Sequence, residues 1–179
     1  MKKKFVVALL ILCGCLSLTG CHIISDLASA NFVLNKGPMI TKIYREKVFH
    51  SINIDSINGD IHFKNANHYR VIYKGNKNLM PTVKMYGTTL NIKNKRVARI
   101  NSIQDITVEM PKRYLNFVDA NASNGDINVD YCNAKGYNLS ADNGDVTFND
   151  KNMDDSYNKN SSSQQLLSAY SDNGDVSVN

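Results

Sequence analysis

The tripeptide Asn-Gly-Asp occurs four times in this chain, in "INGDIHF", "SNGDINV", "DNGDVTF" and "DNGDVSV". Apolar residues stand two and four positions after each glycine, and again five and seven positions before it, with mostly polar residues between them. Alternation with a period of two predicts β-strands that have one apolar face and one polar face. Each copy is therefore predicted to fold as a strand, a tight corner and a second strand.

The repeated tripeptide is itself typical of a turn. Asparagine and glycine tolerate a positive φ, which costs other L-residues roughly 1 to 2 kcal/mol, and Asn or Asp side chains can bond to their own backbone two residues on. A catalytic residue needs to occur only once, so four copies favour a structural role. We also expect the asparagine side chains to stack between adjacent repeats. The predicted structural turn residues are Asn58, Gly59, Asp60, Asn124, Gly125, Asp126, Asn143, Gly144, Asp145, Asn173, Gly174 and Asp175.

The spacing of the four copies indicates a repeat architecture. Their glycines stand 66, 19 and 30 residues apart, and a period near twenty is the size of one coil or hairpin. The excess in the last interval is the polar stretch "NDKNMDDSYNKNSSSQQ", which predicts an exposed loop. The first interval has room for about three units, with candidate strands at 69–73, 82–86, 89–92, 106–110 and 115–118. Only "SSSQQLLSAY" shows a short helical period, so the prediction is an all-β domain that is β-solenoid-like or built of stacked hairpins.

The N-terminus has the features of an export signal. "MKKKFVVALLILCGCLSLTG" has a basic start, an apolar run and small residues at its end, which predicts a signal-peptide helix over residues 1–20. The apolar run is shorter than the roughly twenty residues that a membrane-spanning helix needs. The next residues complete "LTGC", which resembles the lipobox of bacterial lipoproteins. That resemblance implies cleavage before Cys21 and acylation of its thiol with diacylglycerol, with palmitate a typical acyl chain.

Two alternatives to this processing remain open, namely an ordinary secretory signal with a chance cysteine, and cleavage before Cys15. On the lipoprotein interpretation, residues 21–44 form a lipidated tether and residues 45–179 form the β-repeat domain. The protein would then lie on the extracytoplasmic face of the cell membrane.

The four motifs, together with "GTTLNI" and "DITVEMPKRY", resemble the putative adhesin domain of bacterial surface proteins over about residues 45–179. The resemblance implies a repetitive, solenoid-like all-β domain whose biochemical role is largely unassigned. It therefore bears on the fold more than on a ligand.

Charge is divided unevenly along the chain. Residues 36–113 hold 15 basic and 5 acidic side chains, whereas residues 115–179 hold 3 basic and 10 acidic ones. Such asymmetry can mark contact with a polyanion, although solvated surfaces also carry charge runs. We expect the basic half, including Lys93, Lys95, Arg96 and Arg99, to face anionic cell-wall polymer or lipid headgroups.

The search for a reactive site gives no candidate. The aspartates of the corners, with Asp142 and Asp172, lack the glycine-rich nonapeptide spacing of calcium-binding β-rolls. The four histidines, His22, His50, His62 and His68, have no zinc-ligand spacing. Cys132 is the one cysteine left after the signal and Cys21, and we expect it to pack rather than react. The sequence therefore predicts no metal, no cofactor and no enzymatic activity.

Two further expectations concern partners. The aromatic residues of "HYRVIYKGNK" favour cross-strand packing over the stacking of bases or sugars, and no nucleic-acid partner is expected. The last strand, 175–179, has nothing after it to cap a stack, so it should either meet a partner or lie antiparallel inside a sheet. The first functional hypothesis is a surface interaction module that binds wall polymer, glycan or a surface protein. The alternative is an envelope structural or stress-linked protein without a dedicated ligand, and the oligomeric state is left open.

Overall fold

The computed structural model describes residues 37–94, 104–112, 115–131 and 133–179. Cys21, the signal segment, most of the tether, Lys95, Arg96, Arg99 and Cys132 lie outside the described residues. The described part contains fifteen β-strands and one short 3-10 turn, Lys77–Leu79, arranged in two mixed sheets of eight and seven strands. The prediction of an all-β, solenoid-like domain is confirmed. Within this part of the chain, no helix has the length and apolarity needed to cross a membrane.

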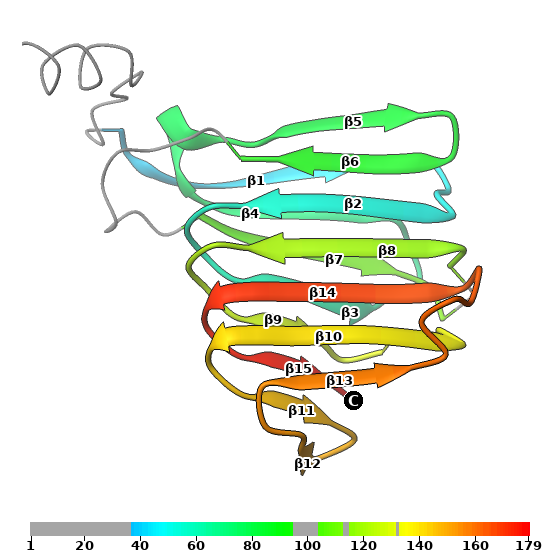
Figure 1. Ribbon diagram of the computed structural model, residues 1–179. Coiled ribbons are helices and arrows are strands. Elements are labelled where there is room, and N and C mark those ends of the chain that lie inside the picture. Colours follow the sequence, from blue (N-terminus) through cyan, green and yellow to red (C-terminus); the bar gives the residue numbers. More distant parts are fainter. Residues whose placement is uncertain (1–36, 95–103, 113–114, 132) are drawn as a thin grey trace, which may run out of the picture. The chain divides into compact units, whose positions relative to one another are not determined.

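Each Asn-Gly-Asp corner connects a strand of the seven-stranded sheet to a strand of the eight-stranded sheet (Figure 1). We call each such pair of strands a coil. The four coils are β2 (Ser51–Ser56) with β3 (Ile61–Asn65), β8 (Phe117–Ala122) with β9 (Ile127–Val129), β10 (Gly136–Asn143) with β11 (Val146–Phe148), and β14 (Leu166–Asn173) with β15 (Val176–Val178). In the two sheets β6 (Thr89–Lys93) and β7 (Gln104–Met110) take the equivalent places beside β2 and β3.

The coils pair in parallel, in the register that alignment on the glycines predicts. Ile61 is matched with Ile127, Ile127 with Val176, and Val176 with Val146. All four of these side chains are fully buried, so the apolar faces of the two sheets meet in one core. A slip of one residue would turn this set toward solvent, which is why period-two sequences specify register strongly.

The coils are not stacked in chain order. The seven-stranded sheet begins with β13 (Ser156–Lys159), continues through β10, β14, β8, β2 and β6, and ends with β5 (Thr82–Tyr86). The last coil therefore lies between the β8/β9 coil and the β10/β11 coil. Figure 1 shows the red β14 between β8 and the yellow β10. The expectation of an edge strand or an antiparallel strand at the end of the chain is wrong, because β15 pairs in parallel with β9 on one side and β11 on the other.

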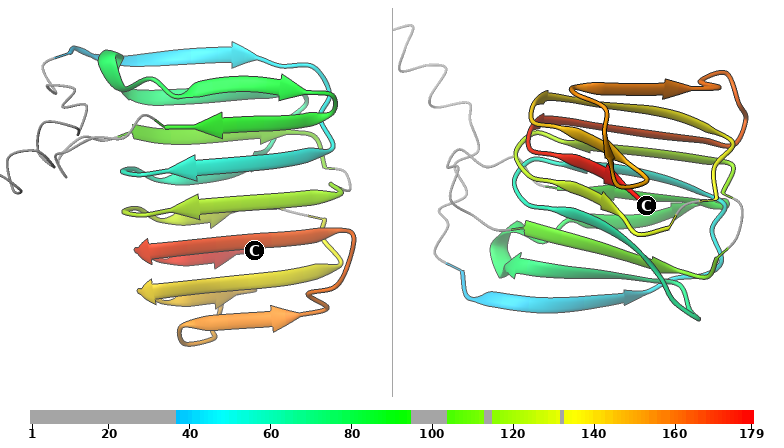
Figure 2. Two further views of the ribbon diagram at one scale, coloured as in Figure 1. Left: turned by 45° about the horizontal axis from the view of Figure 1, so that its top comes forward. Right: turned by 90° about the horizontal axis from the view of Figure 1, so that it is seen from below.

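Antiparallel strands cover both ends of the stack, as the views of Figure 2 show. At one end β1 (Met39–Arg45) pairs with β4 (Arg70–Asn76), β4 pairs with β7, and β5 (Thr82–Tyr86) pairs with β6. At the other end β12 (Lys151–Asn152) pairs with β11, and β13 (Ser156–Lys159) pairs with β10.

Several sequence-based expectations change accordingly. The polar stretch 149–165 is not only a loop, since it contributes the capping strands β12 and β13. The interval between Gly59 and Gly125 supplies the β6/β7 pair and two antiparallel strands, β4 and β5, rather than about three repeat units. The segment with a short helical period contains the start of β14. The sheet also begins before the expected boundary at residue 45, because β1 pairs with β4 along its whole length.

Candidate functional site

The four corner asparagines form a continuous row of side-chain amides along the stack. Asn124 Nδ2 donates to Asn58 Oδ1 at 3.1 Å, Asn173 Nδ2 donates to Asn124 Oδ1 at 3.1 Å, and Asn143 Nδ2 donates to Asn173 Oδ1 at 3.2 Å. Each donating amide also bonds to a backbone carbonyl of the next coil at 3.0–3.2 Å. The row therefore connects each corner with its neighbour through two hydrogen bonds per amide.

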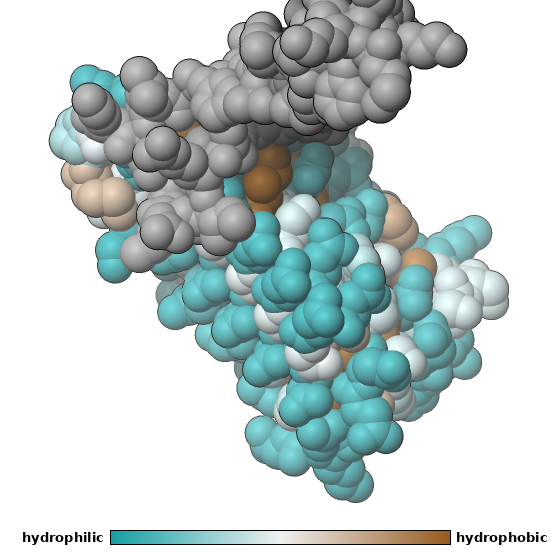
Figure 3. All heavy atoms as spheres, turned by 60° about the vertical axis from the view of Figure 1, so that its left-hand side comes forward, coloured by the Kyte–Doolittle hydropathy of each residue, from teal (hydrophilic) through white to brown (hydrophobic). Residues whose placement is uncertain are grey.

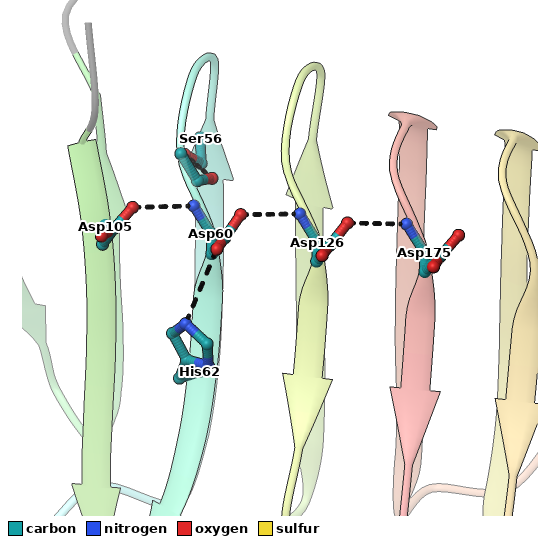
Figure 4. A network of polar contacts seen from close by, with 7 residues as sticks. Ser56, Asp60, His62, Asp105, Asp126 and Asp175 are labelled. Carbon is teal, nitrogen blue, oxygen red and sulfur yellow. Dashed lines mark hydrogen bonds and ion pairs between the residues drawn. The ribbon is translucent and has the colours of Figure 1, made fainter.

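The corner aspartates form a second row, of which Figure 4 shows Asp60, Asp126 and Asp175. Asp60 Oδ1 accepts from the Asp126 backbone N–H at 3.0 Å, Asp126 from Asp175 at 2.9 Å, and Asp175 from Asp145 at 2.9 Å. Asp105 on β7 extends the row by accepting from the Asp60 N–H. Burial raises the pKa of the Asp105 carboxyl, and this hydrogen bond opposes part of the rise. These carboxylates act as acceptors for backbone donors.

The corner glycines allow neighbouring backbones to approach closely. A Cβ built on Gly125 would lie 2.4 Å from the Gly59 carbonyl oxygen, and one built on Gly174 would lie 2.4 Å from that of Gly125. These three glycines also have φ between +125° and +148°. Gly144 is different, because its φ is not in the positive region, yet a Cβ there would lie 2.3 Å from the Gly174 oxygen. The argument from positive φ is therefore wrong for Gly144, where close approach is the constraint.

His62 and His68 each lie beside a different acidic side chain. His62 Nε2 is 3.9 Å from Asp60 Oδ2, and His68 Nε2 is 2.7 Å from Glu109 Oε2, which also bonds to Arg70. The Arg70 guanidinium is the main reason that the pKa of Glu109 lies below its usual range. No group of three His, Cys, Asp or Glu side chains among the described residues is arranged to hold a metal ion. Viewed from the side that carries the corners, the domain is mainly hydrophilic, with scattered apolar areas (Figure 3).

A groove of about 710 Å³ lies on the solvent-facing side of the seven-stranded sheet, across β5, β6, β2 and β8. Two rows of polar residues cross these four strands in register. The first row is Lys84, Asn91, Asn53 and Asp119, and the second is Thr82, Lys93, Asp55 and Asn121.

The polar groups of the groove are partly paired with one another. Asn53 Nδ2 donates to Asn91 Oδ1 at 3.2 Å, and Lys93 Nζ lies 3.2 Å from Asp55 Oδ2. The buried Asn94 donates from Nδ2 to Ser56 Oγ at 3.2 Å, while its Oδ1 has no hydrogen-bond partner in the part of the chain that the structure describes. Tyr86, with 63% of its surface exposed, lines the groove on the outermost strand, β5. The groove thus offers amides, carboxylates, ammonium groups and one aromatic ring to a bound molecule.

Comparison with protein families identifies the domain. The family model described as Toastrack DUF4097 matches residues 49–179. The chain belongs to the Toastrack DUF4097 family. The match begins just before β2 and includes all four corners of this Toastrack domain. No curated protein matches the chain.

Several solved structures resemble this Toastrack chain. A putative adhesin from Bacteroides fragilis is 19% identical, with a TM-score of 0.41, over 79% of this chain and 62% of that one. A putative lipid binding protein from Parabacteroides distasonis is 15% identical, with a TM-score of 0.41, over 54% of this chain and 42% of that one. A putative cell adhesion protein from Clostridium sporogenes is 8% identical, with a TM-score of 0.36, over 79% of this chain and 99% of that one. The chain thus spans less than two thirds of the first two.

The corner rows and the groove differ in how easily they can be recognised in the sequence. The corner residues recur as a tripeptide and are visible in the sequence, and the structure brings all twelve into adjacent rows. The groove draws single polar residues from four strands, and no local motif marks them. The only signal is the polar half of each period-two strand, which by itself is equally typical of a solvated face.

Proposed function

We propose that the protein is a non-enzymatic binding module, held at the extracytoplasmic face of a membrane by a lipid on Cys21, whose groove binds a glycan chain. The observation that supports this most is the groove itself, with four asparagines and two aspartates among its lining residues. Amide and carboxylate groups can exchange hydrogen bonds with adjacent hydroxyl groups of a sugar. An exposed tyrosine ring supplies an apolar face together with a polar tip.

The geometry of the groove fits an extended polymer better than a small molecule. Neighbouring strands lie about 4.8 Å apart, so each polar row repeats at a spacing comparable with one sugar ring. The groove is open along the sheet, and its two rows cross the same four strands. A chain of sugars lying across the strands would therefore meet a similar set of polar groups at each step.

The charge of the groove is balanced, which bears on the kind of glycan. Its lining contains two lysines, Lys84 and Lys93, and two aspartates, Asp55 and Asp119. The groove alone thus favours a neutral or mixed-charge glycan, while the basic residues elsewhere in 36–113 would add attraction for an anionic wall polymer. Only that second contribution should weaken strongly as salt screens it.

The experiment is a co-sedimentation assay of the full-length protein with purified cell-wall polysaccharide at low and high salt. Asn53→Ala with Asp119→Ala should weaken binding by about tenfold or more, since several hydrogen bonds of about 1 kcal/mol each are lost. Asn138→Ala is the matched control, because Asn138 is an exposed residue of the same sheet outside the groove. Equal binding by wild type and both variants would reject the groove. Complete absence of binding would favour the structural role without a dedicated ligand.

The lipid anchor has its own test, which does not depend on the glycan. Two or more acyl chains should hold the protein at a membrane, because each buried methylene contributes about 0.8 kcal/mol whereas one chain binds only marginally. Cys21→Ser should release the protein to the soluble fraction or leave it unprocessed, with Cys132→Ser as the matched control. A Cys21→Ser variant of mature size that still fractionates with membranes would contradict the anchor.

A further inference from the structure

Asparagine followed by glycine is the dipeptide most prone to spontaneous deamidation, because glycine leaves the following backbone nitrogen unhindered. That nitrogen attacks the asparagine Cγ, its proton passes to a solvent base, and ammonia leaves as a cyclic imide forms. Water then opens the imide at either carbonyl to give aspartate or isoaspartate. The chain contains four Asn-Gly dipeptides, all of them at the corners.

Three of the four attacking nitrogens are held in hydrogen bonds by the next coil. The Gly59 N–H donates to the Asn124 carbonyl at 2.8 Å, the Gly125 N–H to Asn173 at 2.9 Å, and the Gly174 N–H to Asn143 at 3.3 Å. The side-chain oxygens of the three preceding asparagines each accept a bond from a neighbouring amide in the asparagine row. Cyclisation at these corners must therefore break bonds to both reacting groups.

The corner at Asn143 and Gly144 is the end of both rows. Neither the Gly144 N–H nor the Asn143 Oδ1 has a hydrogen-bond partner among the described residues. The cap, made of β12, β13 and the turn between them, bonds to the strands on each side of this corner, through Ala141 N–H to the Asp155 carbonyl and Val146 N–H to the Asp154 carbonyl. It also reaches the corner aspartate, through Asn152 Nδ2 to Asp145 Oδ2 at 3.4 Å, but it bonds neither the Gly144 N–H nor the Asn143 side chain. Asn143 is also exposed, whereas Asn58 is buried and Asn124 is half-buried. Within the described part of the chain, the Asn143 side chain is restrained only by the two hydrogen bonds that its Nδ2 donates.

We propose that Asn143 is a site of spontaneous deamidation and isoaspartate formation, and that stacking protects the other three corner asparagines. Conversion to aspartate removes the amide donor that bonds to the Asp172 carbonyl and to Asn173 Oδ1. Conversion to isoaspartate also inserts one more backbone atom between β10 and β11. Both products loosen the β10/β11 coil and its cap, so damage to the domain should begin at this end of the stack.

The test compares Asn143 with Asn173, because both lie in the same local sequence, "DNGDV". The full-length protein in detergent is incubated in mildly alkaline buffer, and initial rates are measured by peptide mapping with mass spectrometry and isoaspartate methyltransferase labelling. Asn143 should react on the order of tenfold faster than Asn173, since reaction there requires fewer hydrogen bonds to open. In denaturant the two rates should become equal. Asn143→Gln should remove most of the methyltransferase signal from the native protein.

Equal native rates at Asn143 and Asn173 would overturn the proposal, as would faster reaction at Asn58 or Asn124. Because the measurement is of modification and not of binding, its result is independent of the glycan assay.

Discussion

At the scale of the residue, each of the three residues of the corner tripeptide meets a different structural requirement. Asparagine supplies a two-donor amide that bonds to the next coil, and aspartate supplies an acceptor for the next backbone N–H. Glycine is required by space at all four corners, and by a positive φ as well at three of them. The motif therefore recurs because each coil must present the same surface to its neighbour.

Two glycine variants distinguish close approach from backbone conformation. Gly144→Ala places a Cβ 2.3 Å from the Gly174 carbonyl oxygen without a positive φ, and Gly87→Ala meets a φ of +60° with nothing within 4 Å. Forcing an atom into packed structure typically costs about 1 to 3 kcal/mol, so Gly144→Ala should lower the unfolding free energy by at least about 2 kcal/mol. Gly87→Ala should cost about 1 kcal/mol. Urea denaturation measures both, and a loss for Gly144→Ala no larger than that for Gly87→Ala would contradict the close-approach argument.

At the scale of the element, the sequence predicts strands and register well because both are local properties of a period-two pattern. The order of the coils is not local. The corners at Gly144 and Gly174 share the sequence "DNGDV", so nothing in the motif says which of them should lie beside the corner at Gly125. The cap could not be predicted from the sequence either, because β12 and β13 attach through backbone pairing and carry no apolar alternation. In the cap, Tyr157 stacks on Phe148 with ring centroids 4.5 Å apart.

The two candidate sites also differ in whether they depend on local sequence or on the order of the coils. The corner residues could be predicted because they repeat, and the asparagine row could be expected because a repeated turn brings equal side chains together. The groove could not be predicted, because it depends on β5 pairing antiparallel with β6 and on β8 lying beside β2. Asn53 and its neighbour Asp119 are 66 positions apart in the sequence, and no local pattern links positions so distant. The open end of the asparagine row likewise appears only once the order of the coils is known.

At the scale of the whole molecule, the inserted last coil makes the domain unlike a linear solenoid. In a linear stack each repeat contacts only its chain neighbours, so removing the last repeat shortens the stack and leaves the rest folded. Here β14 and β15 separate the β8/β9 coil from the β10/β11 coil. The stack also places most of the acidic half of the chain, in β10 to β15, away from the basic strands β1, β4 and β5. The last coil, β14 with β15, thus joins two coils that come earlier in the sequence.

Deleting residues 166–179 tests this topology. The deletion removes the buried Leu167, Ala169, Val176 and Val178, and burial of a Val or Leu side chain contributes about 1.5 to 3 kcal/mol. The summed loss of burial free energy is comparable with the unfolding free energy of a whole domain, which is roughly 5 to 15 kcal/mol. The truncated chain should therefore lose its cooperative urea transition, and adding the peptide 163–179 should restore it. As a control, deletion of residues 37–45 removes only the edge strand β1 and should leave a cooperative transition. A cooperative transition near the wild-type midpoint in the chain without residues 166–179 would show that the remaining coils close the gap, and would reject the interior role of the last coil.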